Sequence, residues 1–301
     1  MPDSPQSPQP QPLRAALWMI GAIVSFSSMA VAGRAVSLDL DTFELMMYRS
    51  IIGIAIVLTL GASFGTLGQV SKRRLGTHLL RNSFHFAGQN LWFFALTMAP
   101  LAQVFALEFT SPLWVTLLAP FLLGEKLTKR RGLVALAGFV GILIVARPFG
   151  GALNLGLVAA ALAAVGFAGT TIFTKRLTRT ESVTCILFYL TVMQAILGLG
   201  FAGFDGDIAL PSPSTLPWLL LIGVAGLLAH FCITTALTLA PALVVIPVDF
   251  ARLPVIAAVG MLFYGEFLDV WVFLGAGIIF AANYYNIWAE SSKSRARAAI
   301  L

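Results

Sequence analysis

A segment in the first half of the chain returns in the second half at a fixed spacing of 141 residues. The sequence Ala-Leu-Thr-x-Ala-Pro occurs at 95–100 and again at 236–241, and Gly-Glu occurs at 124–125 and again at 265–266. These are turn-forming residues rather than interchangeable aliphatic ones, so chance does not account for the match. The chain is therefore predicted to be an internal duplication.

Ionisable and aromatic residues obey the same spacing. Glu108 corresponds to Asp249, and Phe109 corresponds to Phe250. Further pairs at this spacing are Phe26 with Phe167, Arg34 with Lys175, and Tyr48 with Tyr189. The duplication therefore covers most of the chain without a gap.

The composition indicates the environment of the duplicated unit. The chain is 58% hydrophobic and 11% charged, whereas soluble domains average about 25% charged residues. Its mean hydropathy is +0.90. Apolar segments of about 20 residues, the length that crosses a ~30 Å hydrocarbon core as a helix, recur from end to end. A soluble fold is excluded because it would expose large apolar patches, and a multi-pass membrane protein is predicted.

Ten transmembrane helices are predicted, five in each repeat, giving an all-α membrane protein. They cover residues 15–36, 42–62, 79–98, 101–122, 131–148, 154–174, 182–203, 216–238, 242–263 and 270–289. The predicted organisation is a disordered tail (1–13), a first five-helix repeat (14–150), a second, inverted repeat (151–290) and a basic cytoplasmic tail (291–301). The two repeats are expected to surround a central cavity.

The inversion follows from the odd number of helices, because two successive five-helix units enter the membrane from opposite sides. The charges favour the same arrangement. Cations gather in alternate loops, at Arg14, Lys72–Arg74, Lys126–Arg131, Lys175–Arg179 and Lys293–Arg297, while acids such as Asp39, Asp205 and Asp269 occupy the other loops. The positive-inside rule then predicts that both termini are cytoplasmic. The expected location is a bacterial inner membrane.

Two acids lie inside predicted helices, where an ionised group costs about 2.5–3.5 kcal/mol. Glu108 and Asp249 are each about seven residues from opposite membrane surfaces, close to the depth of substrate and ion sites in inverted-repeat transporters. They could bind a cation, a proton or a substrate ammonium. The alternative is a structural ion pair, because Arg252 follows Asp249 by three residues.

Arg49 and Arg252 are the other buried cations. A guanidinium in a water-lined cavity can hold a carboxylate through two hydrogen bonds, so either could bind the acid group of an amino acid. Each could instead form a locking ion pair between helices. A structural role is favoured for Arg49, and both interpretations remain open for Arg252.

Polar residues concentrate on the third and eighth predicted helices. His85, Gln89 and Trp92 share one helix face, Asn90 is adjacent, and His230 occupies the position of Gln89 in the second repeat. They could line a cavity, or bond one another between helices at roughly 0.6 kcal/mol per contact. The predicted substrate-binding residues are His85, Gln89, Asn90, Trp92, Glu108, His230, Asp249 and Arg252.

The sequence contains no motif for a metal site, a disulfide framework or a known catalytic group. Cys185 and Cys232 lie in apolar segments and are predicted to be packing residues, with no disulfide, metal site or cofactor. The three histidines have no ligand partners nearby in the sequence, and no Ser-His-Asp, HExxH or phosphate-loop pattern occurs. No nucleic-acid partner is expected, since the cations belong to short loops. Glu125 and Glu266, in the repeated turns, are predicted to be architectural. A membrane-embedded enzyme remains the alternative of another class.

The segment SPLWVTLLAPFLLGEKLTKRRGLVALAGFVGILIV, the Tyr48-Arg49 start of the second helix and the two five-helix halves resemble the EamA-type drug/metabolite transporters. The counterpart YGEFLDVWVFLGAGIIF is a weaker match. The resemblance implies ten helices in inverted halves, a central cavity and alternating access. Within the family the chain is most similar to YddG-type exporters of aromatic and other neutral amino acids.

The resemblance implies a secondary transporter that exports a small metabolite, an aromatic or other neutral amino acid, with protons as a possible coupling ion. A broad-specificity drug or metabolite efflux carrier is the alternative within transport. The expected partners are the small-molecule substrate and the lipid bilayer.

The charge pattern makes a direct prediction about topology. Reporter fusions after Lys129–Arg131 and after Asp269 are expected to report opposite sides of the membrane, because these equivalent turns carry opposite charge. The two fusions reporting the same side would refute the inverted arrangement.

Overall fold

The computed structural model describes residues 11–37, 39–123, 128–147, 154–177, 179–204, 206–239, 245 and 248–298. All regular secondary structure within these ranges is helical. The helices of the first half are α1 (Pro12–Val36), α2 (Thr42–Ser63), the 3-10 helix η1 (Leu67–Gln69), α3 (Leu75–Met98), α4 (Leu101–Glu108), α5 (Ser111–Leu123) and α6 (Lys129–Ala146). Those of the second half are α7 (Leu155–Leu177), α8 (Val183–Ala202), α9 (Leu216–Leu239), α11 (Arg252–Tyr264) and α12 (Val270–Ala298).

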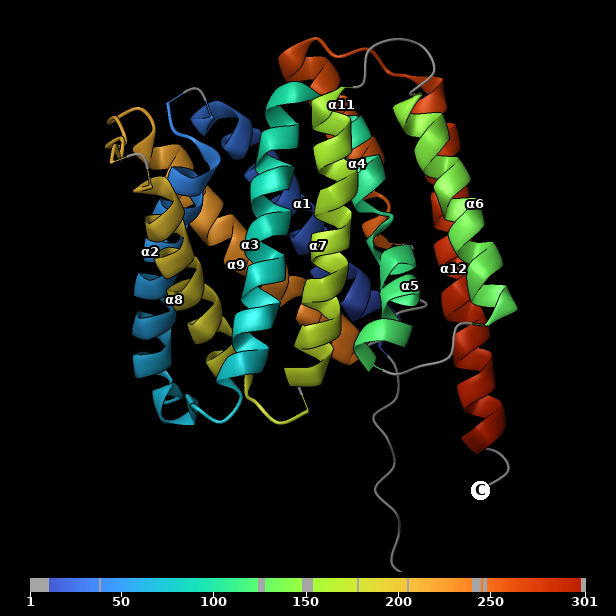
Figure 1. Ribbon diagram of the computed structural model, residues 1–301, viewed down its shortest axis with the longest axis horizontal. Coiled ribbons are helices and arrows are strands. Elements are labelled where there is room, and N and C mark those ends of the chain that lie inside the picture. Colours follow the sequence, from blue (N-terminus) through green and yellow to red (C-terminus); the bar gives the residue numbers. More distant parts are fainter. Residues whose placement is uncertain are drawn as a thin grey trace, which may run out of the picture.

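Helices at equivalent places in the two halves run in opposite directions (Figure 1). In that view α1 ascends while α7 descends, α2 descends while α8 ascends, and α6 ascends while α12 descends. Contacts at helix ends show that helices of the two halves also pack antiparallel to each other. The Gln11 N–H at the start of α1 donates to the Leu239 carbonyl at the end of α9, at 2.9 Å. Arg147 after α6 pairs with Asp269 before α12.

The two halves pack through helix pairs that the repeat symmetry relates to one another. α3 lies along α7, and its counterpart α9 lies along α1. Two further pairs, α2 with α8 and α6 with α12, consist of equivalent helices meeting each other. Gly141 and Gly275 make the last contact close, because a Cβ on either would come within 2.9 Å of the other's carbonyl oxygen. At Gly277, by contrast, a Cβ would meet open space.

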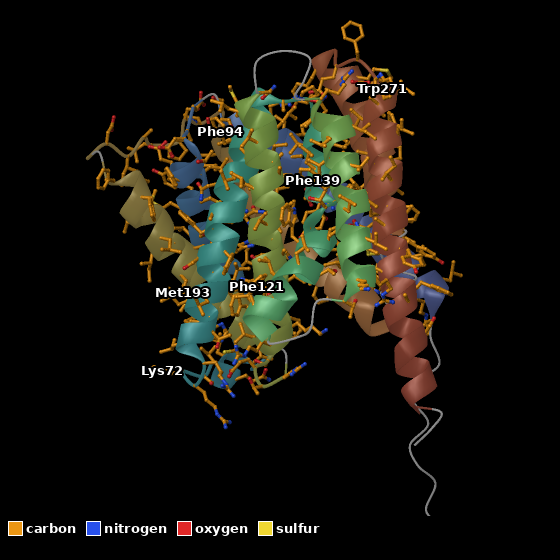
Figure 2. All side chains as sticks on the ribbon, turned by 45° about the vertical axis from the view of Figure 1, so that its right-hand side comes forward. Lys72, Phe94, Phe121, Phe139, Met193 and Trp271 are labelled. Atoms are coloured by element: carbon orange, nitrogen blue, oxygen red, sulfur yellow. The ribbon has the colours of Figure 1, made fainter. Side chains whose placement is uncertain are left out.

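Polar and apolar residues are distributed as in a membrane protein. Among the described residues, seven helical segments are long and apolar enough to cross a bilayer by length and composition. Phe94 and Phe139 lie on the outside of the bundle (Figure 2), 38% and 51% exposed. On α3, by contrast, Asn82 and His85 are buried. Because lipid is as apolar as a protein core, this arrangement fits a multi-pass membrane protein.

The number of spanning helices stays a prediction. α3 is too polar to satisfy a hydropathy criterion, and the apolar helices Gly132–Ala146 and Arg252–Tyr264 are short. The last helix extends beyond its predicted end at residue 289, to Ala298. The first begins at Pro12, inside the predicted tail. Glu125, Pro241 and residues 1–10 lie outside the described residues.

The helix predicted over 101–122 is in fact interrupted after Glu108, and α5 resumes at Ser111. Pro112 explains the interruption, because it has no N–H to donate to the carbonyl of Glu108. The Leu113 N–H turns to the Thr110 carbonyl, at 2.9 Å. The Phe109 carbonyl is thereby released from the helix ladder, and Asn283 of α12 donates to it at 2.8 Å.

The second half is interrupted at the equivalent place. Phe250 and Ala251 form a turn, and α11 begins at Arg252. Pro254 has no N–H to donate to the Phe250 carbonyl, so a proline explains this interruption too. Pro254 lies one position after the residue that is equivalent to Pro112. Both breaks directly follow the aligned acids Glu108 and Asp249.

The repeated Gly-Glu turn at 265–266 joins three parts of the bundle. Gly265 ends α11 with a φ of 63°, a left-handed conformation that favours glycine. The Glu266 carboxylate accepts from Arg34 at 2.5 Å and from the Leu101 N–H at 2.9 Å. Arg34 also donates to the Leu96 and Ala99 carbonyls at the end of α3. The architectural role predicted for Glu266 is confirmed.

The released Phe109 carbonyl provides a test of the interruption. Asn283→Leu is expected to lower the free energy of unfolding by about 1–3 kcal/mol, the cost of leaving a buried acceptor unsatisfied. Reversible unfolding in mixed detergent measures the change. Asn286→Leu, one turn along α12, is the matched control, because Asn286 donates to the Thr116 hydroxyl and not to a backbone carbonyl. Equal losses in the two variants would contradict this role.

Candidate functional site

The two aligned acids meet on a single guanidinium. Arg252 Nη2 lies 3.1 Å from Glu108 Oε1 and 3.2 Å from Asp249 Oδ2. The Arg252 side chain is 4% exposed, and those of Glu108 and Asp249 are each 16% exposed. The ion pair between Arg252 and Asp249, the alternative to a substrate role for Asp249, is present in the structure. Glu108, which has no cation near it in the sequence, receives one from the second half of the chain.

Aromatic rings surround this guanidinium. The Arg252 Cζ atom lies 4.6 Å from the ring centre of Phe26, 5.1 Å from that of Phe105 and 4.9 Å from that of Phe109. The faces of such rings attract a cation electrostatically, most strongly where water is excluded. The cation is thus held by two carboxylates and three rings.

The rings of Phe109 and Phe250 stack with centres 4.3 Å apart and planes 17° apart. These residues are equivalent in the two repeats, and equivalent residues can touch only near the axis that exchanges the halves. The acids immediately before them therefore also lie close to that axis. The cluster of Glu108, Asp249 and Arg252, called the central cluster below, occupies the meeting point of the repeats.

Predicted residues of α3 and α9 approach the cluster from one side. Trp92 Nε1 donates to Glu108 Oε2 at 2.8 Å. The imidazoles of His85 and His230 lie 6.0 Å apart, centre to centre. Phe26 touches His230, and its repeat equivalent Phe167 touches His85. A continuous row of ring contacts therefore runs from Arg252 through Phe26, His230 and His85 to Phe167.

Gln89 and Asn90 make their described hydrogen bonds outside the central cluster. Gln89 Oε1 accepts a hydrogen bond from Arg49, whose guanidinium also faces the Phe93 ring at 6.0 Å. Asn90 donates to the Phe86 carbonyl of its own helix at 2.8 Å. The structural role favoured for Arg49 agrees with this contact, although its partner is an amide and not an acid.

A small cavity lies beside Arg49, between α2, α8 and α9. It measures about 20 Å³, room for about one water molecule. Its walls include Ser50, Thr191 and Gln194. The predicted site residues themselves are closely packed, since His85, Gln89, Asn90, Trp92 and Arg252 are all buried.

Several polar atoms in the packed centre lack a hydrogen-bond partner among the described residues. They are Arg252 Nε and Nη1, Asp249 Oδ1, both ring nitrogens of His85, and Asn90 Oδ1. Unpaired buried polar groups are costly, and in native proteins they usually meet water, an ion or a ligand. The centre therefore retains both donors and acceptors available to a bound molecule.

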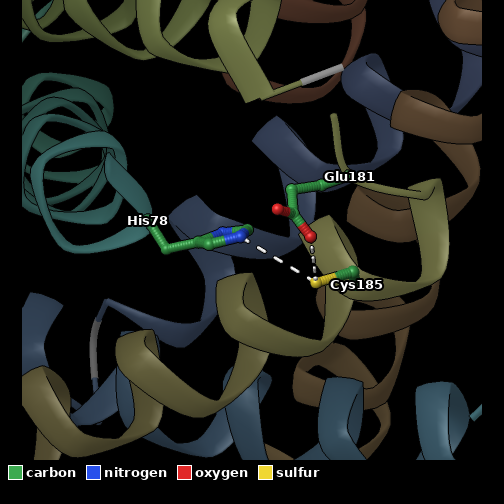
Figure 3. Close-up of side chains that lie close together, drawn as sticks. All are labelled: His78, Glu181 and Cys185. Atoms are coloured by element: carbon green, nitrogen blue, oxygen red, sulfur yellow. Dashed lines mark hydrogen bonds between the residues drawn. The ribbon is translucent and has the colours of Figure 1, made fainter. Parts of the chain in front are cut away.

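A second polar group, near the end of the bundle where Lys72 lies, was not predicted (Figure 2). His78, Glu181 and Cys185 are brought together from α3, the α7–α8 turn and α8 (Figure 3). His78 thus gains two possible ligand partners more than 100 residues away. The local spacing of these residues carries no such signal, because their proximity depends on the packing of α3 against α8.

The fold and the buried ionic centre define a multi-pass membrane protein of transporter type. The model of the EamA-like transporter family matches the chain twice, over residues 13–147 and 154–288. The chain therefore belongs to the EamA-like transporter family.

Characterised relatives cover almost the whole chain. A riboflavin transporter of Vibrio cholerae serotype O1 is 31% identical over 94% of this chain and 96% of its own length. An S-adenosylmethionine uptake transporter of Rickettsia bellii is 27% identical, covering 91% and 93%. The pseudopaline exporter CntI of Pseudomonas aeruginosa is 26% identical, covering 87% and 91%. A crystal structure 21% identical in sequence has the same fold, with a TM-score of 0.60 over 89% of this chain and 94% of that one.

The ionic centre predicts a strong effect of removing its cation. Arg252→Gln is expected to lower the free energy of unfolding by about 3–5 kcal/mol, because it leaves two buried carboxylates without a counter-charge. A triple variant that adds Glu108→Gln and Asp249→Asn is expected to recover most of the loss. Thermal unfolding of purified protein measures both changes. If the triple variant were no more stable than the single one, packing rather than charge would explain the effect.

Proposed function

We propose that the chain is a secondary transporter that moves a small metabolite by alternating access, with the central cluster at the heart of its substrate site. The carrying observation is that Glu108 and Asp249, equivalent in the repeats and each followed by a helix break, meet on one buried arginine. Transporters built from inverted repeats place substrate and ion sites at such broken helices near the bilayer midplane. Relatives named as transporters support this function over a membrane-embedded enzyme.

The proposal assigns residues 14–150 and 151–290 to two inverted five-helix repeats in a bacterial inner membrane, with residues 1–13 and 291–301 as cytoplasmic tails. The opposite directions of α1 and α7 and of α2 and α8 support the inversion (Figure 1). Lys72 and Trp271 lie at opposite ends of the bundle (Figure 2), and Trp271 follows the acid Asp269 by two residues, which fits a cytoplasmic face at the Lys72 end.

The central cluster suits a zwitterionic amino acid. Arg252 retains two unpaired donors for a substrate carboxylate, and Asp249 retains an unpaired oxygen for a substrate ammonium. A zwitterion offers both charges at once, so it can enter without leaving a buried charge uncompensated. Phe26, Phe105 and Phe109 supply apolar surface next to these groups. An aromatic or other neutral amino acid is therefore the proposed cargo, moved outward.

The charge of the cluster supports coupling to protons. One arginine faces two carboxylates, so a single negative charge remains in excess. Protonation of one acid would make the cluster neutral, and an ionised excess charge is costly at this depth. Glu108 is the proposed proton carrier, because no cation neighbours it along its own helix, whereas Asp249 has Arg252 three residues away.

The closely packed site residues correspond, in this proposal, to an occluded state between the two open states. His85, Gln89, Asn90, Trp92 and His230 would then line the cavity when either face opens. A broad-specificity efflux carrier is the second candidate, supported by the differing cargoes in the relatives' names: riboflavin, S-adenosylmethionine and pseudopaline.

Flux into proteoliposomes tests the proposal. The panel contains phenylalanine, tryptophan, leucine, S-adenosylmethionine and riboflavin, each with and without a pH gradient. An aromatic amino acid is expected to cross faster than in empty liposomes, with saturation, and its flux is expected to change when a pH gradient is imposed. Transport of riboflavin or S-adenosylmethionine alone would support the carrier function and rule out an amino acid as the cargo. Rates equal to those of empty liposomes for every compound would discard both.

The role of Glu108 predicts a selective loss. Glu108→Gln is expected to lower the flux at least tenfold while the protein stays folded, because the amide keeps the shape and the Asp249 carboxylate still balances Arg252. Asp207→Asn, the same chemical change in an exposed loop, is the matched control and is expected to keep wild-type flux. Unchanged transport in Glu108→Gln would remove this residue from the mechanism.

A further inference from the structure

The group of His78, Glu181 and Cys185 lies apart from the central cluster and has no part in the proposed transport step (Figure 3). His78 is in the first turns of α3, Cys185 is in the first turn of α8, and Glu181 is in the turn that precedes α8. His78 and Cys185 are fully buried, and Glu181 is 9% exposed. The three residues therefore form an enclosed site at the Lys72 end of the bundle.

The atoms of the site are arranged as metal ligands. One imidazole nitrogen, the thiol sulfur and one carboxylate oxygen all lie within 4.8 Å of one another. His78 Nε2 is 3.9 Å from Cys185 Sγ, and that sulfur is 3.4 Å from Glu181 Oε2. Zinc–ligand bonds of ~2.0–2.3 Å at tetrahedral angles place neighbouring ligand atoms roughly 3.5 Å apart. The two sulfur distances are close to this spacing, and closing the remaining pair, which lies within 4.8 Å, requires a movement of at most about an ångström.

The three side chains do not satisfy all of one another's hydrogen-bonding atoms. Glu181 Oε1 and His78 Nδ1 are buried without a hydrogen-bond partner among the described residues. Arg81, the nearby cation on α3, donates to Asn82 and Thr174 and makes no described ion pair with Glu181. A buried carboxylate in this position favours a cation as its partner.

We propose that His78, Glu181 and Cys185 bind one divalent zinc ion. Mixed sulfur, nitrogen and oxygen ligands suit Zn²⁺, whereas Mg²⁺ and Ca²⁺ prefer oxygen alone. Cys185 binds as the thiolate and releases one proton, so the thiolate and the carboxylate together neutralise the ion. A water molecule or the Ser71 carbonyl, whose oxygen is 3.7 Å from Cys185 Sγ, completes the four ligands.

The site joins the two halves of the chain. His78 and Ser71 belong to the first half, and Glu181 and Cys185 belong to the second. A bound ion therefore fastens α3 to α8 at this end of the bundle. Zinc occupancy would restrain any separation of the two helices there.

Metal binding to the full chain, purified in detergent without a histidine tag and stripped of metal, tests the proposal. Equilibrium dialysis with Zn²⁺ and elemental analysis are expected to find one equivalent per chain. Co²⁺ in place of Zn²⁺ is expected to give the visible absorption of a tetrahedral site and a thiolate-to-cobalt band. Cys185→Ser is expected to lose the band and to weaken zinc binding at least tenfold. Cys232→Ser, which removes the other buried cysteine, is expected to retain both.

Two outcomes would overturn the proposal: a wild-type chain that takes up no zinc, leaving only a hydrogen-bonded trio, or a Cys185→Ser variant that binds zinc like the wild type. If Cys185→Ser fails to fold, Glu181→Gln serves as the second variant and is expected to weaken binding at least tenfold. Protection of Cys185 from alkylation by Zn²⁺ in the wild-type chain gives an independent measurement. Equal alkylation with and without zinc would count against the site.

Discussion

The structure depends on one ionic contact between the halves of the chain. Arg252 supplies the only described cation in contact with Glu108 and Asp249, two acids that the bilayer interior would otherwise expel. Neither half can satisfy the cluster alone, since Glu108 comes from α4 and Arg252 from α11. The same contact places the stacked rings of Phe109 and Phe250 at the axis between the repeats. Assembly of the halves therefore gives Glu108 its counter-charge, and one negative charge remains in excess at the centre.

The central cluster lies at two helix interruptions. Pro112 and Pro254 interrupt the helix ladder next to the acids, and Asn283 satisfies a carbonyl that the first interruption releases. An uninterrupted helix would pair all of its backbone N–H and C=O groups at this depth within the helix itself. The interruptions instead leave polar backbone and side-chain atoms near the centre, and Arg252 and Asp249 keep unpaired positions there. A site of this kind can exchange internal partners for those of a ligand.

The sequence predicted much of this architecture because the duplication preserves residues with specific roles. The 141-residue spacing picked out the two acids of the ionic centre, Glu108 and Asp249, and the Gly-Glu turn at 265–266, but not the contact between Glu108 and Arg252. Helix boundaries followed from apolar segments and turn residues. The mean hydropathy of the segment did not reveal the interruption at Phe109, although Pro112 is a local signal for it. The contacts of Asn283 with Phe109 and of Arg34 with Glu266 join residues 174 and 232 positions apart, and no local pattern marks them. His78 and Cys185 meet for the same tertiary reason.

The central claim is that Arg252 and its two acids recognise both charges of a zwitterionic cargo. Intrinsic tryptophan fluorescence, with Trp92 bonded to Glu108, can compare the binding of phenylalanine, phenylalanine methyl ester and 3-phenylpropionate to the purified chain. The ester lacks the carboxylate and the propionate lacks the ammonium, so each leaves one side of the cluster unmatched. The account predicts saturable binding of phenylalanine at least tenfold tighter than that of either analogue. Equal affinity for all three compounds, or no saturable binding of phenylalanine, would contradict it.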